Sequence, residues 1–141
     1  MRDTDTMLGS MDLATQECEV EIDLDAMTAT FESSRGSASA SGECVRVLAA
    51  YALARRDENR VDGGWLTAQE IYNRWVDLGG NASSKMDRPG FERGKLRNQL
   101  TKQSVTSVKS LFERRASGAR TEIRLNMPPD GISVFGQGLE D

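Results

Sequence analysis

The feature that most constrains the fold is an unbroken alternation of acidic and apolar residues near the start of the chain. From Glu17 to Asp25 every second residue is a carboxylate, and the residues between them are Cys, Val, Ile and Leu. Period-two alternation is typical of a β-strand with one solvated and one buried face. The apolar residues move to odd-numbered positions between Met27 and Phe31, which predicts a bulge or a turn near Ala26. We therefore expect a strand whose solvated face is wholly acidic.

The middle of the chain changes to helical spacing. A stretch of small residues at 33–41 is predicted to be a Ser/Gly linker. Residues 44–56 carry their apolar side chains on one stripe, which predicts the first helix. Thr67 and Glu70 have the spacing of a capping box, so a second helix is expected to start there. The glycine pair at 79–80 ends that helix.

The third predicted helix is basic. It covers about residues 90–103, and Phe91, Leu96 and Leu100 are its apolar anchors. The next segment, 105–115, is open to two interpretations. Its apolar spacing favours a helix that runs to about residue 112, whereas its Ser, Thr and Val content favours a strand. We expect the helix.

The end of the chain returns to the spacing of strands. Residues 116–119 read as a turn, and residues 121–127 read as a strand with its odd-numbered side chains inward. Residues 132–135 can add one more short strand. The fold class is therefore expected to be α+β, with an N-terminal acidic strand, three to four helices and a C-terminal β-hairpin.

A chain of 141 residues is long enough for one domain with a sizeable core. We expect a flexible leader at 1–16 and an acidic strand region with its Ser/Gly linker at 17–42. The main domain is expected at 43–135, followed by a tail at 136–141.

Charge is segregated along the chain. Residues 1–44 contain ten acids and two bases, whereas residues 85–127 contain eleven bases and four acids. The net charge of −4 therefore averages two regions of opposite sign. Clustered Lys and Arg are the electrostatic footprint of a protein that binds phosphates. The low overall pI consequently hides a candidate polyanion-binding region.

Several functional classes are disfavoured. The chain has no histidine, which removes Ser-His-Asp and Cys-His nucleophiles and most zinc sites. Its two cysteines, Cys18 and Cys44, are too few for an all-cysteine zinc site and are expected to be free thiols rather than a disulfide. We expect no enzyme activity, no cofactor and no metal site.

No apolar run approaches the roughly 20 residues of a membrane span. The acidic first ten residues have no apolar core and do not read as a signal peptide. We therefore expect a cytoplasmic protein without a membrane partner.

The basic region resembles a known family. The stretch LRNQLTKQSVTSVKSLFERR, residues 96–115, resembles a helix-turn-helix, and the following ASGARTEIRLN resembles a wing with a glycine at its tip. Together, residues 43–127 resemble a winged helix-turn-helix DNA-binding domain. The acidic strand region is similar to the amino-terminal sheet of OmpR/PhoB-type effector domains. The resemblance implies a reader helix in the major groove and a wing along the backbone or minor groove.

This resemblance and the basic charge predict a transcription regulator or nucleoprotein that binds double-stranded DNA. Its Lys and Arg residues would neutralise phosphates, and its amides could read adenine edges. A homodimer is a further expectation, because one winged helix reads only a short site. The candidate DNA-binding residues are Arg93, Lys95, Arg97, Asn98, Lys102, Lys109, Arg114, Arg115 and Arg120.

Two helices are candidates for the reader. If it is the helix at 90–103, Arg93, Arg97 and Asn98 face the bases. If it is the segment 105–115, the residues that face the bases are Ser104, Thr106, Ser107, Lys109 and Ser110. Amides at Gln99 and Gln103 belong to the first candidate.

The acidic strand has a competing functional interpretation. It could cover the basic helix within the molecule, or it could be a docking edge for the basic surface of another protein. In the second case the chain is a winged-helix protein–protein adaptor. The candidate partner surface is Glu17, Glu19, Glu21, Asp23 and Asp25.

The large aromatic residues fall in or beside helical stripes and are expected to be core residues rather than base-stacking platforms. They are Tyr51, Trp65, Tyr72, Trp75 and Phe91.

Overall fold

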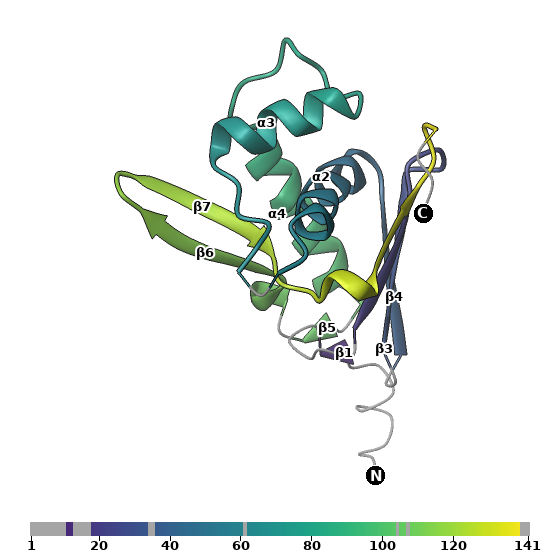
Figure 1. Cartoon of the computed structure of the whole chain (residues 1–141). Helices are drawn as coiled ribbons and strands as arrows, with labels where there is room; N and C mark the ends of the chain where they lie inside the picture. Colours follow the sequence, from purple (N-terminus) through teal and green to yellow (C-terminus); the bar gives the residue numbers. More distant parts are fainter. Residues whose placement is uncertain are drawn as a thin grey trace.

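The computed structural model describes residues 11–12, 18–33, 36–60, 62–103, 105–106 and 108–138. The fold is α+β, as predicted. Three helices in the described part, α2 (Glu43–Asp57), α3 (Ala68–Asp77) and α4 (Arg88–Thr101), lie between a sheet and a hairpin. Figure 1 shows the sheet on one side of α2 and α4, and the hairpin projecting from the other side.

The four-stranded sheet has the order β4-β3-β2-β8. Strands β2 (Glu19–Asp23), β3 (Thr28–Ser33) and β4 (Gly36–Ser41) form an antiparallel meander, and β8 (Ile132–Phe135) pairs with β2 in parallel. The predicted alternation in β2 is confirmed, since its residues are alternately exposed and buried. Because β8 pairs along its free side, β2 is a central strand, and its expected role as a docking edge is wrong.

The predicted turn near Ala26 is confirmed. The Asp23 carboxylate accepts hydrogen bonds from the backbone N–H groups of Asp25 and Ala26 at 2.9 and 3.0 Å. Met27 then adopts a φ of 55°, in the left-handed region. This tight reversal moves the buried residues from even positions in β2 to Ala29 and Phe31 in β3.

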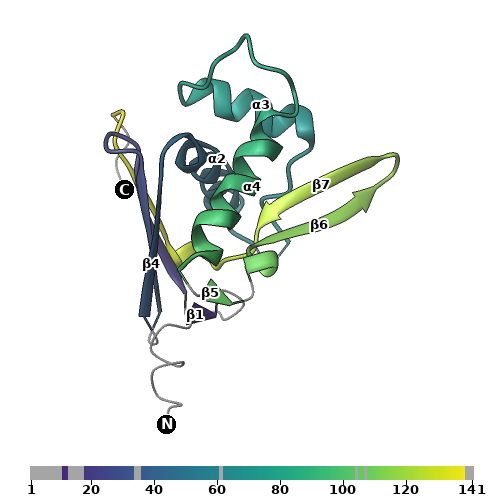
Figure 2. The ribbon, with the colours of Figure 1, turned by 180° about the vertical axis from the view of Figure 1, so that it is seen from behind.

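Of the segment predicted as a Ser/Gly linker, residues 36–41 form the edge strand β4 instead, and residues 34–35 lie outside the described part. Its alanines, Ala38 and Ala40, face the core, and its serines are exposed. Figure 2 shows α4 beside β4, and two glutamines of the α4 region bind the free edge of this strand. Gln99 accepts from Ser41 N–H and donates to Ser41 O, at 3.0 and 2.9 Å. Gln103 makes the same pair of hydrogen bonds to Ser39. The small side chains of β4 let the helix approach closely enough for these contacts.

The helices between residues 43 and 80 form where predicted. The capping box is present, since Thr67 Oγ1 accepts from Glu70 N–H and the Glu70 carboxylate accepts from Thr67 N–H. Helix α3 ends at glycines because Gly79 has a φ of 107°. A Cβ at Gly80 would lie 2.4 Å from the buried indole of Trp75, so only glycine fits there.

The predicted helix at 105–115 is wrong. This segment contains β5 (Val105–Thr106), a 3₁₀ turn (Val108–Leu111) and the start of β6 (Phe112–Ser117). Its Ser, Thr and Val content favoured a strand, and pairing with β7 (Arg120–Leu125) outweighs its apolar spacing. The predicted C-terminal hairpin is therefore present, and its first strand begins within the segment expected to be helical.

One hydrophobic cluster joins the elements. It includes Phe31 from β3, Leu48 from α2, Leu100 from α4 and Val134 from β8. The cluster crosses the predicted boundary between residues 42 and 43, and the predicted domain limits stay predictions. Cys18 and Cys44 are free, as expected, and both are buried.

The predicted ends of the chain fall largely outside the described residues. Within the leader expected at 1–16, Met11–Asp12 is described and forms β1, which pairs in parallel with β5. Residues 139–141 of the predicted tail lie outside the described part.

Replacing both Gln99 and Gln103 by alanine is expected to lower the free energy of unfolding by about 1–2 kcal/mol, because four hydrogen bonds to the edge strand are lost and only water replaces them. Urea unfolding measures the change. The control is Asn98→Ala, an exposed residue of the same helix, for which a loss within about 0.5 kcal/mol is expected. Equal losses in the two proteins would contradict the assigned role of the glutamines.

Candidate functional site

Helix α4 presents four different faces. Leu96 and Leu100 are buried in the core, and Gln99 turns towards β4. Arg93 and Arg97 turn towards the hairpin, where they line a hollow. The remaining face is solvent-exposed and is called the α4 stripe here. It consists of Phe91, Lys95, Asn98, Thr101 and Lys102.

The α4 stripe contains three of the predicted DNA-binding residues, Lys95, Asn98 and Lys102. All three are exposed, and Lys95 Nζ lies 4.8 Å from the centre of the Phe91 ring. Phe91 itself is 60% exposed, so the expectation that it is a core residue is wrong. Its position on the helix is opposite Leu96 and Leu100, which a count of helical spacing from the leucines could have shown.

A buried carboxylate lies beneath the stripe. Glu92 is 1% exposed and accepts a 2.7 Å hydrogen bond from Arg88 Nε, while Lys95 Nζ lies 3.8 Å away. A buried charge must be paired to be tolerated. Glu92 therefore fixes the first turns of α4, and its ion pairs hold the side chains of Arg88 and Lys95 against the helix.

Two predicted residues, Arg93 and Arg97, lie instead at the hairpin side of α4, together with Arg114 of β6. Arg93 Nη1 donates to the Tyr51 hydroxyl at 3.0 Å, and its guanidinium lies 5.9 Å from the centre of the Phe112 ring. Among the described residues, no carboxylate lies within ion-pair distance of these three guanidinium groups. Burial, with the charges of Arg93 and Arg114, lowers the pKa of Arg97.

The opposite face of the hairpin holds its arginines in ion pairs. Arg115 Nε lies 2.8 Å from Glu122, and Arg124 Nε lies 2.7 Å from Glu113. Both guanidinium groups also stack on Trp65, with centroid distances of 4.3 and 4.7 Å. The pKa of Arg115 is raised by its hydrogen bond to Glu122 and by Asp62. Arg115, a predicted interface residue, is thus engaged within the hairpin.

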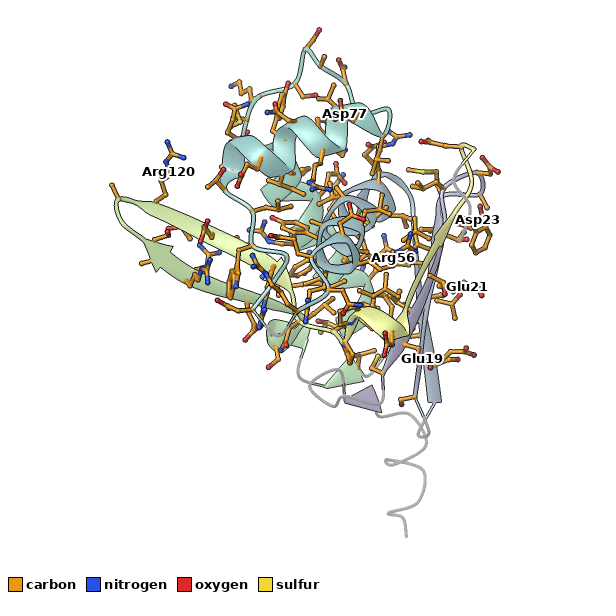
Figure 3. The ribbon with its side chains drawn as sticks, in the orientation of Figure 1. Glu19, Glu21, Asp23, Arg56, Asp77 and Arg120 are labelled. Atoms are coloured by element: carbon orange, nitrogen blue, oxygen red, sulfur yellow. The ribbon has the colours of Figure 1, made fainter. Side chains whose placement is uncertain are left out.

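The hairpin tip carries the next predicted residue. Arg120 is exposed and lies opposite Ser117, beside a turn in which Gly118 has a φ of 65° (Figure 3). Six-residue strands extend roughly 20 Å, which carries the tip well beyond the body of the protein. The side chain of Lys109 lies outside the described part of the chain, as do Ser104 and Ser107.

The acids predicted as a partner surface are described in part, and their role stays a prediction. Glu19, Glu21 and Asp23 project from the sheet on the side away from the helices (Figure 3). They cannot cover α4, so the expected intramolecular cover is wrong. Asp25 lies in the turn after β2, where its carboxylate accepts from Gln137 N–H, and Glu17 lies outside the described residues.

The sequence predicted that the amides of Gln99 and Gln103 belong to a base-reading helix, and the structure does not support this role. Their amides, which matched the chemistry that reads adenine, are used to bind the edge of β4. Sequence reasoning also missed Tyr51 as the residue that positions Arg93. Both contacts join residues more than forty positions apart, so local spacing contains no signal for them.

The described residues contain no group of three or more carboxylates or cysteines placed to hold a metal ion. None of the helices in the described part is long and apolar enough to cross a membrane. No protein family model, curated protein or solved structure matches this chain.

The two arginine environments predict different effects of substitution on the free energy of unfolding. Arg124→Met is expected to lower the free energy of unfolding by about 1–3 kcal/mol, since it leaves a hydrogen-bonded carboxylate unpaired. Arg97→Met is expected to leave it unchanged or raise it, because the charge it removes is repelled by two neighbours. Urea unfolding of both variants decides the comparison. A loss at Arg97 as large as that at Arg124 would contradict the picture of an unpaired arginine cluster.

Proposed function

We propose that this protein is a winged-helix protein that binds double-stranded DNA without catalysing a reaction. The element order supports the proposal. Helix α2 is followed by Leu66, whose backbone pairs with Ile123 of β7, and then by α3, α4 and the β6–β7 hairpin. In this arrangement α3 and α4 form the helix-turn-helix pair, in place of the pair expected from residues 90–115.

The observation that carries the proposal is the α4 stripe. Lys95, Asn98 and Lys102 project from one exposed helix face, and that helix is anchored on its other faces by the core and by β4. An α-helix fits the major groove of B-DNA, where Lys hydrogen-bonds to guanine and Asn to adenine. A helix held rigidly on two sides can present these groups in a fixed register.

The hairpin supplies the second contact. It projects beside α4 and carries the exposed Arg120 at its tip (Figure 3). A duplex lying along α4 would bring its sugar–phosphate backbone to the hairpin, as wings do in this class of domain. The proposal includes a homodimer. Two copies would place their α4 helices on successive turns of the duplex and so raise the affinity for DNA.

The test is a fluorescence-anisotropy titration of a random-sequence duplex at several salt concentrations. Affinity should fall with salt at a log–log slope of about −0.9 for each phosphate neutralised. Replacing Lys95 and Lys102 together by alanine should therefore reduce the slope by about 1.8. The matched control is Arg74→Met, a surface charge that pairs with Asp57 on the α2 side of α3 and should leave the slope unchanged.

Absence of salt-dependent binding, or equal slopes in the double variant and the wild type, would contradict the DNA proposal. A second candidate, a protein–protein adaptor, would then be favoured. Its specific support is the solvated face of the sheet, where Glu19, Glu21 and Glu32 surround a shallow hollow with Asp130. Among the described residues these carboxylates have no basic partner, and a basic protein surface would complement them.

A further inference from the structure

A hollow of about 550 Å³ lies between α4 and the inner face of the hairpin. The helix supplies one wall and strand β6 the other. This volume is within the range of about 300–1,000 Å³ that is typical of small-ligand sites. We call it the arginine hollow. Its lining residues are Arg93, Arg97, Asn98, Thr101, Phe112, Glu113, Arg114 and Ile123.

The charge of the hollow is unbalanced. Arg93, Arg97 and Arg114 supply three guanidinium groups from two different elements. Among the described residues, Glu113 is the only carboxylate in the lining, and it already accepts a 2.7 Å hydrogen bond from Arg124 Nε. The rest of the hairpin shows that this chain pairs its arginines where it can, since Arg115 and Arg124 both have carboxylate partners. The three arginines of the hollow have no carboxylate partner among the described residues, and in this they differ from the other arginines of the hairpin.

The hollow is also preorganised. Phe112 packs edge-on against Tyr51, with ring centres 5.1 Å apart, and the Tyr51 hydroxyl holds Arg93 at 3.0 Å. Tyr51 is 1% exposed and Phe112 is 8% exposed, so both belong to the core. The guanidinium of Arg93 is thus fixed by rigid neighbours. Gathering such charges costs free energy in the absence of a ligand, and burial together with the charges of Arg93 and Arg114 lowers the pKa of Arg97.

We propose that the arginine hollow binds a phosphate group. The guanidinium fork matches phosphate oxygens with paired hydrogen bonds. A tetrahedral phosphate offers oxygens in enough directions for three guanidinium groups, whereas a carboxylate offers two oxygens in one plane. Phe112 and Ile123 give the hollow an apolar wall, and its volume exceeds that of a phosphate alone. The fitting ligand is therefore a phosphate ester with an attached sugar or other organic group.

A phosphate ester can reach the hollow from either of two sources, the backbone of a DNA duplex or a free phosphorylated small molecule. Asn98 and Thr101 belong both to the hollow and to the α4 stripe, so the two surfaces are continuous. A duplex that occupies the stripe would bring a backbone phosphate to the hollow. This duplex part rests on the proposed function, whereas phosphate binding itself does not.

The first experiment titrates the full-length protein with inorganic phosphate and follows the backbone amide shifts by NMR, against sodium chloride at equal ionic strength. Saturable shifts at residues 93–101 and 112–114 with phosphate alone are expected. Arg97→Met and, separately, Arg114→Met should weaken this binding about ten-fold or more, because each removes charged hydrogen bonds. Arg74→Met is the control and should bind like the wild type. Identical effects of phosphate and chloride, or wild-type affinity in both hollow variants, would overturn the proposal.

The second experiment separates the sources. Duplex affinity is measured with and without phosphate at constant ionic strength. A backbone phosphate in the hollow predicts competition by inorganic phosphate and a salt slope that falls by about 0.9 in Arg97→Met. A free phosphorylated ligand predicts unchanged duplex binding in Arg97→Met, although phosphate binding by this variant is weakened. Complete absence of duplex binding would end the proposed function, while the phosphate titration would still decide the hollow.

Discussion

The packing of α4 is the constraint on which the rest of the structure depends. Leu96 and Leu100 enter the core and fix the rotation of the helix about its axis. With that rotation set, the glutamine on one flank reaches β4, the arginines on the other flank reach the hairpin, and the stripe between them is left to solvent. A helix has 3.6 residues per turn, so no side chain of α4 can move to another face without removing the leucines from the core.

The basic side chains of α4 and the hairpin occur in two electrostatic environments, one with carboxylate partners and one without. On the outer face of the hairpin, arginines are paired with carboxylates and stack on Trp65, which stabilises the base of the hairpin. On the inner face and along α4, Arg93, Arg97, Arg114 and Lys102 have no carboxylate partner among the described residues. Unpaired and clustered charge weakens a fold slightly, and such local costs are common at binding sites. This contrast within one hairpin is the strongest internal indication that the inner surface is used for binding.

The sequence predicted those parts of the fold that depend on local patterns. The alternation in β2, the stripe of α2 and the capping box of α3 were all readable because each depends on residues a few positions apart. The strand β4 was missed, since Ser, Ala and Gly have low strand propensity, and its pairing with Gln99 spans 58 positions. The segment 105–115 was misassigned because its apolar spacing fits a helix and only pairing with β7 decides against it. At the candidate site, the clustering of basic residues was readable from the sequence, and their role stays a prediction. The division of the arginines into those with and without carboxylate partners follows from the register of the hairpin and was not readable beforehand.

The most direct test of the central claim, that α4 and the inner face of the hairpin form a nucleic-acid surface, is an NMR footprint. Backbone amide shifts would be recorded for the full-length protein with and without a short random-sequence duplex at low salt. The account predicts changes along α4 and at the tip and inner face of the β6–β7 hairpin, with β2 and β3 unaffected. Changes confined to the acidic face of the sheet, or no changes in any part of the chain, would contradict it.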